Sequence, residues 1–288
     1  MAVVVITGTS TGIGLATAVA FGRARYDVYA TMRNPDRAPE LASVAAKERL
    51  PVKVLAMDVD DDASVDKAIA GVLADKGRID VLVNNAGISV GGSVEELPLS
   101  EFRQAMETNY FGALRCIQAV IPGMRERRSG HIVNVSSVAG KLAGPAQGPY
   151  TASKWALEAL SESLAGEVKP FGIHVSIVEP GVIATAIFGK RREIPANTRY
   201  PHERRLNALF DASLKQPVSP FVVADKMVEI VRSDTWKLRH PVGPDAEPFL
   251  QYRASMSDEQ WVDLMAIESD QEWAAIVKRD FGLDVDLG

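Results

Sequence analysis

A tyrosine and a lysine four residues apart, Tyr150 and Lys154, are the side chains with the clearest chemistry. On a helix, residues at this spacing lie on one face with Cβ atoms about 5–6 Å apart. A nearby positive charge favours the phenolate, so the lysine is expected to lower the tyrosine pKa from its usual value of about 10. Lowering it by about three units needs about 4 kcal/mol, more than one lysine supplies. The pair predicts acid–base chemistry near neutral pH, assisted by a further positive charge.

The start of the chain predicts a strand, a glycine-rich turn and a helix. Residues 2–7 are apolar and mostly β-branched, residues 8–14 read Gly-Thr-Ser-Thr-Gly-Ile-Gly, and apolar residues then recur at helical spacing. Such a turn lets the backbone approach a pyrophosphate and directs the free N–H groups of the helix start at the phosphates. A plain tight turn is the alternative, but the position between strand and helix argues against it.

Further predicted strands alternate with helical patterns, which indicates an α/β fold with a parallel sheet. Runs such as 81–83 and 132–135 are apolar at nearly every position, as in strands covered on both faces. Strands are expected near residues 2–7, 27–32, 52–57, 79–84, 130–136, 172–178 and 238–242. The candidate motifs directly follow them, at 8–14, Asp58, 84–87, Ser137 and 180–185. Ligands of doubly wound sheets bind at the carboxyl ends of strands, so the motifs predict one cleft.

Together the motifs resemble those of the short-chain dehydrogenase/reductase family. From residue 2 to residue 185 they run Thr7-Gly8-x-x-x-Gly12-Ile13-Gly14, Asn84-Asn85-Ala86-Gly87, Asn109, Ser137, Tyr150-x-x-x-Lys154, Pro180-Gly181 and Thr185. Residues 28–34 and 242–246 resemble the branch of hydroxysteroid and retinol dehydrogenases. The resemblance implies a doubly wound, Rossmann-like sheet of about seven strands in the order 3-2-1-4-5-6-7. It also implies an oxidoreductase that transfers hydride between a nicotinamide and a carbonyl or secondary alcohol, without a metal.

The resemblance assigns catalytic roles to four residues. Tyr150 exchanges the hydroxyl proton, and Lys154 lowers the tyrosine pKa and binds the nicotinamide ribose. The family's serine lies thirteen residues before its tyrosine, so Ser137 rather than Ser136 polarises the substrate oxygen. Asn109, within a helical pattern over residues 102–117, would hold a water that continues a proton relay from Lys154. The alternative for Asn109 is a core asparagine that satisfies its own hydrogen bonds.

The resemblance also assigns the cofactor site. Its residues are Gly8, Ser10, Thr11, Gly12, Ile13, Gly14, Arg33, Asp58, Val59, Asn85, Ala86, Gly87, Tyr150, Lys154, Pro180, Gly181, Ile183 and Thr185. Structural alternatives are a helix-start acid for Asp58 and a strand-ending turn for residues 84–87. NADP(H) is expected in preference to NAD(H), which stays possible. Met32 stands where NAD-selective sites carry a carboxylate, and Arg33 could pair with a 2′-phosphate.

Composition limits the other partners. A formal net charge of −5 over 288 residues argues against nucleic acid or an anionic membrane as the main partner. No stretch approaches the roughly 18 apolar residues of a membrane span. The single Cys116 is expected to be a buried, inert thiol, which favours a cytoplasmic protein. The four histidines are scattered without ligand spacing, so no metal site is expected.

We expect one domain over residues 1–288, with no linker. Residues 186–219 are expected to form a mobile substrate lid whose basic residues are solvated, and residues 244–288 a C-terminal helical extension. Helices are predicted near 245–254 and 258–280, where tryptophans serve packing and the tail could cover the edge of the seventh strand.

The substrate is expected to be a hydrophobic ketone, aldehyde or alcohol, because the loops near the cleft are mostly apolar with few charged anchors. The expected lining is Ile88, Val90, Val94, Val138, Leu142, Ala143, Pro145, Val182, Ile187 and Phe188. Family members usually pair through the helix that carries the lysine, here about residues 148–169. There Trp155, Leu157, Leu160 and Leu164 are more apolar residues than one core face requires, which predicts a homo-oligomer. A homodimer is expected in preference to a homotetramer because the C-terminal tail could cover the edge of the seventh strand.

Two other functions compete with the dehydrogenase. A dinucleotide-sensing or binding protein could use the same fold, although it would not need Ser137, Tyr150 and Lys154. A sugar-nucleotide epimerase or dehydratase of the extended branch would be expected to carry a tighter glycine turn and a longer substrate domain, and neither occurs here.

Overall fold

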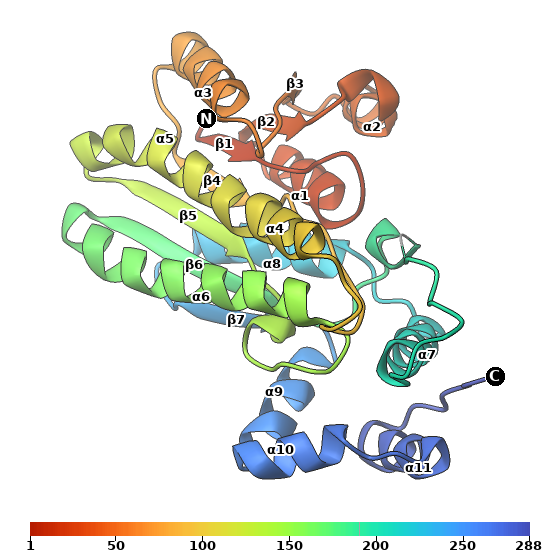
Figure 1. Ribbon diagram of the computed structural model, residues 1–288. Helices are drawn as coiled ribbons and strands as arrows, with labels where there is room; N and C mark the ends of the chain where they lie inside the picture. The colour runs from red at the N-terminus through yellow and green to blue at the C-terminus, as the bar shows by residue number, and fades with distance from the viewer. Residues whose placement is uncertain (190) are drawn as a thin grey trace.

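The computed structural model describes residues 1–189 and 191–288, and its strands form one parallel sheet in the order β3-β2-β1-β4-β5-β6-β7 (Figure 1). The strands are β1 (Val3–Ile6), β2 (Asp27–Met32), β3 (Val52–Ala56), β4 (Val81–Asn84), β5 (Gly130–Val135), β6 (Ile173–Pro180) and β7 (Arg239–Val242). The predicted doubly wound α/β fold, its strand order and its strand positions are confirmed.

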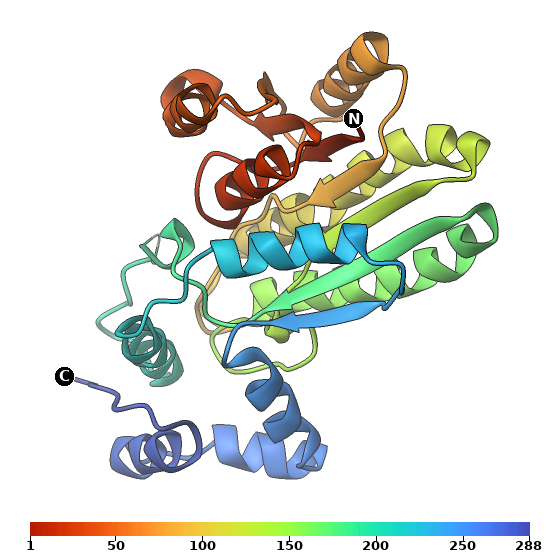
Figure 2. The same ribbon diagram turned by 180° about the vertical axis from the view of Figure 1, so that it is seen from behind.

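Helices cover both faces of the sheet (Figures 1 and 2). They are α1 (Gly12–Arg23), α2 (Glu40–Glu48), α3 (Asp62–Lys76), α4 (Leu99–Met106), α5 (Gly112–Arg127), α6 (Gly148–Val168), α7 (His202–Leu214), α8 (Phe221–Arg232), α9 (Ala246–Ala254), α10 (Asp258–Met265) and α11 (Asp270–Phe281). One layer contains α3, α5 and α6, and the other contains α1, α2 and α8. In β1, Val3 and Val5 belong to the first core, and Val4 and Ile6 to the second. Both faces are buried, which explains the nearly continuous apolar strands.

Helices α1 and α8 pack closely although about 200 residues separate them in the chain. Ala16 and Ala20 of α1 meet Ala224 of α8 in a small cluster of buried alanines. Their short side chains let the two helices approach, so the helix that follows the glycine turn rests on one from the last third of the chain.

The predicted helix at 258–280 is in fact two helices, α10 and α11. Ser257 and Gln260 form a reciprocal capping box at the start of α10, and the Ser269 side chain accepts a hydrogen bond from the backbone N–H of Glu272 at the start of α11. Ser269 therefore begins a new helix where periodicity alone predicted continuation.

The C-terminal extension lies beside α7, beyond the carboxyl ends of the strands (Figure 1). Its hydrogen bonds run to α7 and to the loop after β5, where Trp261 Nε1 donates to the Ala143 carbonyl at 2.6 Å. The expectation that it covers the outer edge of β7 is not supported. Just after β7, Asp245 accepts a hydrogen bond from Val182 N at 2.8 Å, which directs the chain towards the cleft.

Two expectations about side chains on helices are also settled. Cys116 is buried, and its burial raises the thiol pKa to about 12, which agrees with an inert thiol. On α6, Leu157 and Leu164 are 1% and 6% exposed and belong to the chain's own core. They therefore do not provide the apolar surface for a subunit interface that the sequence analysis expected. Trp155 is 49% exposed.

Within the described residues no helix is long and apolar enough to cross a membrane.

Candidate active site

A cleft of about 460 Å³ opens at the carboxyl ends of the central strands. All eighteen residues predicted to bind the cofactor line it, and Ser137 lines it as well. Of the four predicted catalytic residues, only Asn109 lies outside the lining. The structure thus brings together motifs that are spread over residues 8–185, as the shared sheet edge predicted.

Two glycines of the turn after β1 are required by their surroundings. Gly8 has a φ of +70°, and a Cβ there would lie 2.6 Å from the Cα atom of Ala86. A Cβ on Gly14 would lie 2.2 Å from the Gly8 carbonyl oxygen and 2.4 Å from Asn85 Nδ2. The turn therefore sits directly against the segment after β4, at a distance only glycine allows.

Two side chains, one directly after β1 and one directly after β4, hold this turn in place by hydrogen bonds. Asn85 Nδ2 donates to the carbonyl oxygens of Thr7 and Gly8 at 2.9 and 3.0 Å. In return, the Thr7 hydroxyl oxygen accepts from the backbone N–H groups of Asn85 and Ala86 at 3.0 and 2.9 Å. These bonds hold the start of α1 at the cleft, and its first N–H groups are suitable donors for phosphate. The residues present fit a dinucleotide.

The acid–base pair lies at the opposite part of the same cleft. Lys154 is 5% exposed and its Nζ donates to the Val135 carbonyl at 2.8 Å. The same Nζ lies 5.7 Å from the centroid of the Tyr150 ring. Ser137 Oγ accepts from Ala139 N at 3.1 Å, which holds the serine at the end of β5. Helix α6 and β5 therefore place the three predicted groups together.

The pKa of Tyr150 does not shift as the sequence predicts. Burial raises the pKa of its hydroxyl, and a hydrogen bond with Ser137 offsets this only in part. Burial also lowers the pKa of Lys154 to about 8, against the raising effect of the Glu158 carboxylate. Burial thus outweighs the effect expected of Lys154, and the lowering of the tyrosine pKa by Lys154 stays a prediction. A lowered tyrosine pKa needs a further positive charge.

Asn109 lies in a π-helical segment, Glu107–Phe111, that separates α4 from α5. The sequence predicted one uninterrupted helix over this region. Asn109 is 1% exposed, its Oδ1 accepts from Ile88 N at 2.8 Å, and its Nδ2 donates to the Ile88 carbonyl and to Ser153 Oγ at 3.0 and 2.9 Å. A Cβ on Gly87 would lie 3.1 Å from Asn109 Oδ1 and 3.7 Å from Lys154 Nζ. Asn109 thus satisfies its side-chain hydrogen bonds in the core and also borders the lysine pocket through Gly87, so its part in a proton relay stays a prediction.

The other end of the cleft carries the residues predicted to select the cofactor. Met32, 3% exposed, and Arg33, exposed, end β2 and line the cleft. Asp58 and Val59 follow β3 on the same lining. Asp61, rather than Asp58, caps α3, since its side chain accepts from Ser64 N. The helix-start alternative therefore belongs to Asp61.

A second cavity of about 280 Å³ adjoins the cleft, and five residues line both: Ser89, Val90, Glu101, Ile187 and Phe188. Beyond them the wall continues along α7 with Leu206, Asn207 and Phe210. The Phe188 and Phe210 rings pack with centroids 4.9 Å apart. This cavity continues from the cleft that Tyr150 and Lys154 line, and its size would admit a small ligand.

The predicted lining needs correction. Ile88, Val90, Ile187 and Phe188 line one or both cavities, but six other residues line neither: Val94, Val138, Leu142, Ala143, Pro145 and Val182. Val94 is 68% exposed on the outside. The second cavity also holds charged residues that the sequence analysis did not select: Glu101, Arg191, Arg192 and Glu203. Arg192 and Glu203 form a close pair, with Nη2 and Oε2 2.8 Å apart. Such long-range pairs leave no local signal.

Behind the cleft lies a group of buried carboxylates. Glu179, 1% exposed, directly precedes Pro180, and its Oε1 lies 3.9 Å from Arg239 Nε. Glu158, on the face of α6 that carries Lys154, bonds the same Nε at 3.0 Å. Burial and the nearby Glu158 raise the pKa of Glu179 to about 7, although the Arg239 guanidinium opposes them. The Arg239 guanidinium thus interacts with two buried carboxylates, those of Glu158 and Glu179. They lie next to residues 180–185, which are predicted to hold the nicotinamide.

The sequence model of the short chain dehydrogenase family matches residues 2–195 of the chain. The chain belongs to the short-chain dehydrogenase family. An uncharacterized oxidoreductase, YusZ, from Bacillus subtilis is 33% identical to this short-chain dehydrogenase over 272 residues, 91% of this chain and 96% of that protein. Retinol dehydrogenase 8 from Bos taurus is 36% identical over 266 residues, 87% of this chain and 84% of that protein. The similarity to the retinol dehydrogenase agrees with the predicted branch.

Solved structures of this family share the fold. A short-chain dehydrogenase from Streptomyces avermitilis superposes with a TM-score of 0.81 at 36% identity, over 96% of this chain and 98% of that chain. An alcohol dehydrogenase from Thermococcus sibiricus, complexed with 5-hydroxy-NADP, superposes with a TM-score of 0.71 at 25% identity, over 84% of this chain and 95% of that chain. Together with the cleft, they support a nicotinamide-dependent dehydrogenase.

Proposed function

We propose that this short-chain dehydrogenase interconverts a carbonyl and an alcohol on a predominantly apolar substrate, with NADP(H) as its preferred cofactor. The observation that carries the proposal is the convergence of Ser137, Tyr150 and Lys154 on the cleft that the glycine turn also lines. A binding protein would need the turn but not the three side chains.

Each side chain has a separate task in this reaction. In the reductive direction the Tyr150 hydroxyl gives its proton to the substrate oxygen, and in the oxidative direction it accepts that proton. Ser137 donates a hydrogen bond to the same oxygen. Lys154 stabilises the phenolate and binds the ribose, and Asn109 continues the proton relay towards solvent. When bound, the nicotinamide supplies or accepts the hydride.

The residues that would hold the cofactor divide along the cleft. The turn at 8–14 and the start of α1 would bind the phosphates, Asp58 and Val59 the adenine, and residues 180–185 the nicotinamide carboxamide. The proposed preference for NADP(H) is supported by the buried, uncharged Met32 and the exposed Arg33 at the end of β2. No carboxylate at position 32 would repel a 2′-phosphate, and a guanidinium can bond one through two N–H groups.

The second cavity supports an apolar ketone, aldehyde or alcohol as substrate. Val90, Ile187, Phe188, Leu206 and Phe210 give it a largely apolar wall. Its guanidinium groups are already paired, Arg191 with Asp211 and Arg192 with Glu203. Paired cations of this kind have less charge to offer an anionic substrate.

Turnover of NADPH, followed by its absorbance against a panel of hydrophobic ketones and aldehydes, tests the proposal. Tyr150→Phe removes one hydroxyl and should lower kcat by at least about 10²-fold while cofactor binding is retained. Tyr26→Phe is the matched control, because Tyr26 packs on Phe21 outside the cleft. Tight cofactor binding with no turnover of any substrate by the parent protein would favour the sensing function. Near-parental turnover by Tyr150→Phe would overturn the assigned mechanism.

The cofactor preference has its own test in kcat/KM for NADPH and NADH. We expect a ratio above one, and Met32→Asp should move it towards NADH because a carboxylate repels the 2′-phosphate. Arg33→Ala should lower kcat/KM for NADPH more than kcat/KM for NADH. Arg37 is outside the cleft lining, so Arg37→Ala should change neither value. A parental ratio at or below one would refute the preference.

We also propose that the chain is a single domain and a cytoplasmic homodimer that pairs through α6. The exposed Trp155 on that helix and the exposed Phe111, 42% accessible, support an apolar interface on this side of the molecule. A homotetramer is the alternative, and sedimentation at micromolar concentration distinguishes the two from a monomer.

A further inference from the structure

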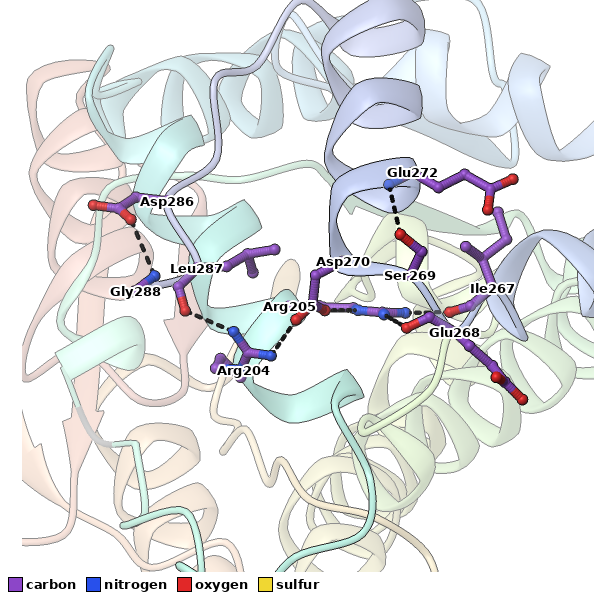
Figure 3. Close-up of polar contacts among 10 residues, drawn as sticks. All are labelled: Arg204, Arg205, Ile267, Glu268, Ser269, Asp270, Glu272, Asp286, Leu287 and Gly288. Carbon is purple, nitrogen blue, oxygen red and sulfur yellow. Dashed lines mark hydrogen bonds and ion pairs between the residues drawn. The ribbon is translucent and has the colours of Figure 1, made fainter.

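The guanidinium of Arg205, on α7, joins that helix to the C-terminal extension (Figure 3). Its Nε donates to Asp270 Oδ1 at 2.8 Å, Nη1 to the Ile267 carbonyl at 2.5 Å and Nη2 to the Glu268 carbonyl at 2.6 Å. The residue is 2% exposed, although the sequence analysis expected the basic residues here to be solvated. All three guanidinium nitrogens therefore bond the loop between α10 and α11 or the first residue of α11.

Two neighbours on α7 add to this junction. Arg204 Nη1 donates to the Leu287 carbonyl at 2.6 Å, and its Nη2 pairs with Asp270 (Figure 3). His202 Nε2 lies 3.2 Å from the Met265 carbonyl oxygen. The first turn of α7 thus contacts the end of α10, the start of α11 and the C-terminal tail.

Little apolar burial holds the extension otherwise. Among the described residues, α10 has no buried side chain and α11 has only Val277. Among its aromatic rings, Tyr252 packs on Trp261 and Phe281, and the Arg205 guanidinium lies 5.8 Å from the centroid of the Trp273 ring. The contacts around Arg205 therefore attach the α10–α11 pair to α7 through both hydrogen bonds and the Trp273 ring.

The same helix forms the far wall of the second cavity. Leu206 and Asn207 follow Arg205 directly, and Phe210 lies on the next turn. On the cavity side, Glu203 is tied to Arg192 by a bidentate pair. The bonds of Arg205 hold α7 against the extension, and the pair of Glu203 with Arg192 holds the same helix on the cavity side. A rotation or shift of α7 would move the pocket wall relative to Tyr150.

We propose that Arg205 is a positioning residue, through which the C-terminal extension fixes α7 and so sets the substrate pocket. The proposal rests on the proposed function, because it concerns the substrate pocket of that reaction. It also removes α7, residues 202–214, from the part of the predicted lid that is expected to be mobile, since α7 is held by a buried guanidinium. The extension would act on substrate selection without contacting the reacting atoms.

Two variants test the role of Arg205. Arg205→Met keeps much of the side-chain length but removes the three donors, and Arg205→Lys keeps the charge but offers a single nitrogen in place of the planar fork. Both should raise the substrate KM by at least about tenfold with little change in the KM for NADPH, because a small misplacement of the pocket wall weakens substrate positioning. Arg253→Met is the control, since Arg253 pairs with Asp258 inside the extension.

Amide hydrogen exchange provides a readout that needs no substrate. Residues 202–214 should exchange slowly in the parent and Arg253→Met proteins and at least about tenfold faster in Arg205→Met. Asp270→Asn, a change at a partly exposed carboxylate, should reproduce the faster exchange if Arg205→Met does not fold. If the parent turns over no substrate, the proposed function fails, and the exchange experiment still decides whether α7 is fixed in this way.

Three outcomes would overturn the proposal. One is unchanged exchange over residues 202–214 in Arg205→Met or Asp270→Asn. Another is an equal rise in KM for substrate and for NADPH, which would indicate a general loss of structure. The third is recovery of the parental substrate KM by Arg205→Lys, because one ammonium cannot make the three bonds of the fork.

Discussion

Replacing Glu179 by glutamine should make the protein's stability less sensitive to alkaline pH. The Glu179 carboxyl is almost fully buried, and the nearest guanidinium, that of Arg239, is shared with Glu158. Burial raises the pKa of Glu179 from 4.5 to about 7. Glutamine has nearly the same shape but carries no charge at any pH, so the substitution isolates the cost of ionising this buried group.

The sign of the effect follows from proton binding. Between pH 4.5 and about 7 the folded chain holds a proton on Glu179 that the unfolded chain has lost. The free energy of unfolding therefore falls as pH rises through this window. The stability that the protonated Glu179 carboxyl contributes is fully present below pH 4.5 and is lost above about pH 7. The difference between the two pKa values corresponds to about 3 kcal/mol, at about 1.36 kcal/mol per pKa unit.

Urea unfolding at about pH 5 and about pH 8.5 measures this contribution. Between these two pH values the parent should lose about 2–3 kcal/mol more stability than Glu179→Gln. Glu167→Gln, at an exposed position on α6, is the matched control and should follow the parent. Equal losses in the parent and in Glu179→Gln would refute the reasoning, because Arg239 would then hold Glu179 ionised throughout.

Four further predictions concern other parts of the molecule. Gly14→Ala should weaken dinucleotide binding by at least about tenfold, because its Cβ would meet the Gly8 carbonyl at 2.2 Å; unchanged affinity by calorimetry would argue against the tight turn. Burial lowers the pKa of His131 to about 4, so the free energy of unfolding should fall on acidification below about pH 6.5. In urea titrations, the free energy of unfolding of His131→Gln should fall less over the same pH range. Cys116 should resist thiol reagents in the native protein and react in urea; rapid native labelling would contradict its burial. Trp155→Ser should shift a dimer towards monomer in sedimentation, and a parental profile would exclude this residue from the interface.

The sheet and the cofactor cleft could be predicted because their signals are local. Strands buried on both faces are apolar at almost every position, and the motifs follow them directly, so strand positions and cleft position come from short windows of sequence. The strand order came from the resemblance to the family. The split of the C-terminal helix at Ser269 also had a local signal, a serine followed three residues later by Glu272, which periodicity concealed.

Other features depend on contacts between distant residues. The π-helical segment around Asn109 keeps the apolar spacing of an α-helix, so its sequence does not distinguish the two. The paired Arg192 and Glu203, and the buried Arg205, look like solvated charges until the fold brings their partners near. The pKa of Tyr150 depends on burial, which the spacing to Lys154 does not report.

The packing of α1 on α8 has a consequence for how the chain acquires its structure during synthesis. The glycine turn belongs to the first fifteen residues made, but the alanine surface behind it is covered only when residues 221–232 have emerged. A nascent chain that ends before α8 would expose Ala16 and Ala20, together with the apolar face of the sheet that Val223 and Met227 cover. Such a chain has the phosphate-binding motif in its sequence but lacks its support. The ability to hold a dinucleotide should therefore arise late on the ribosome, after about four fifths of the protein has been translated.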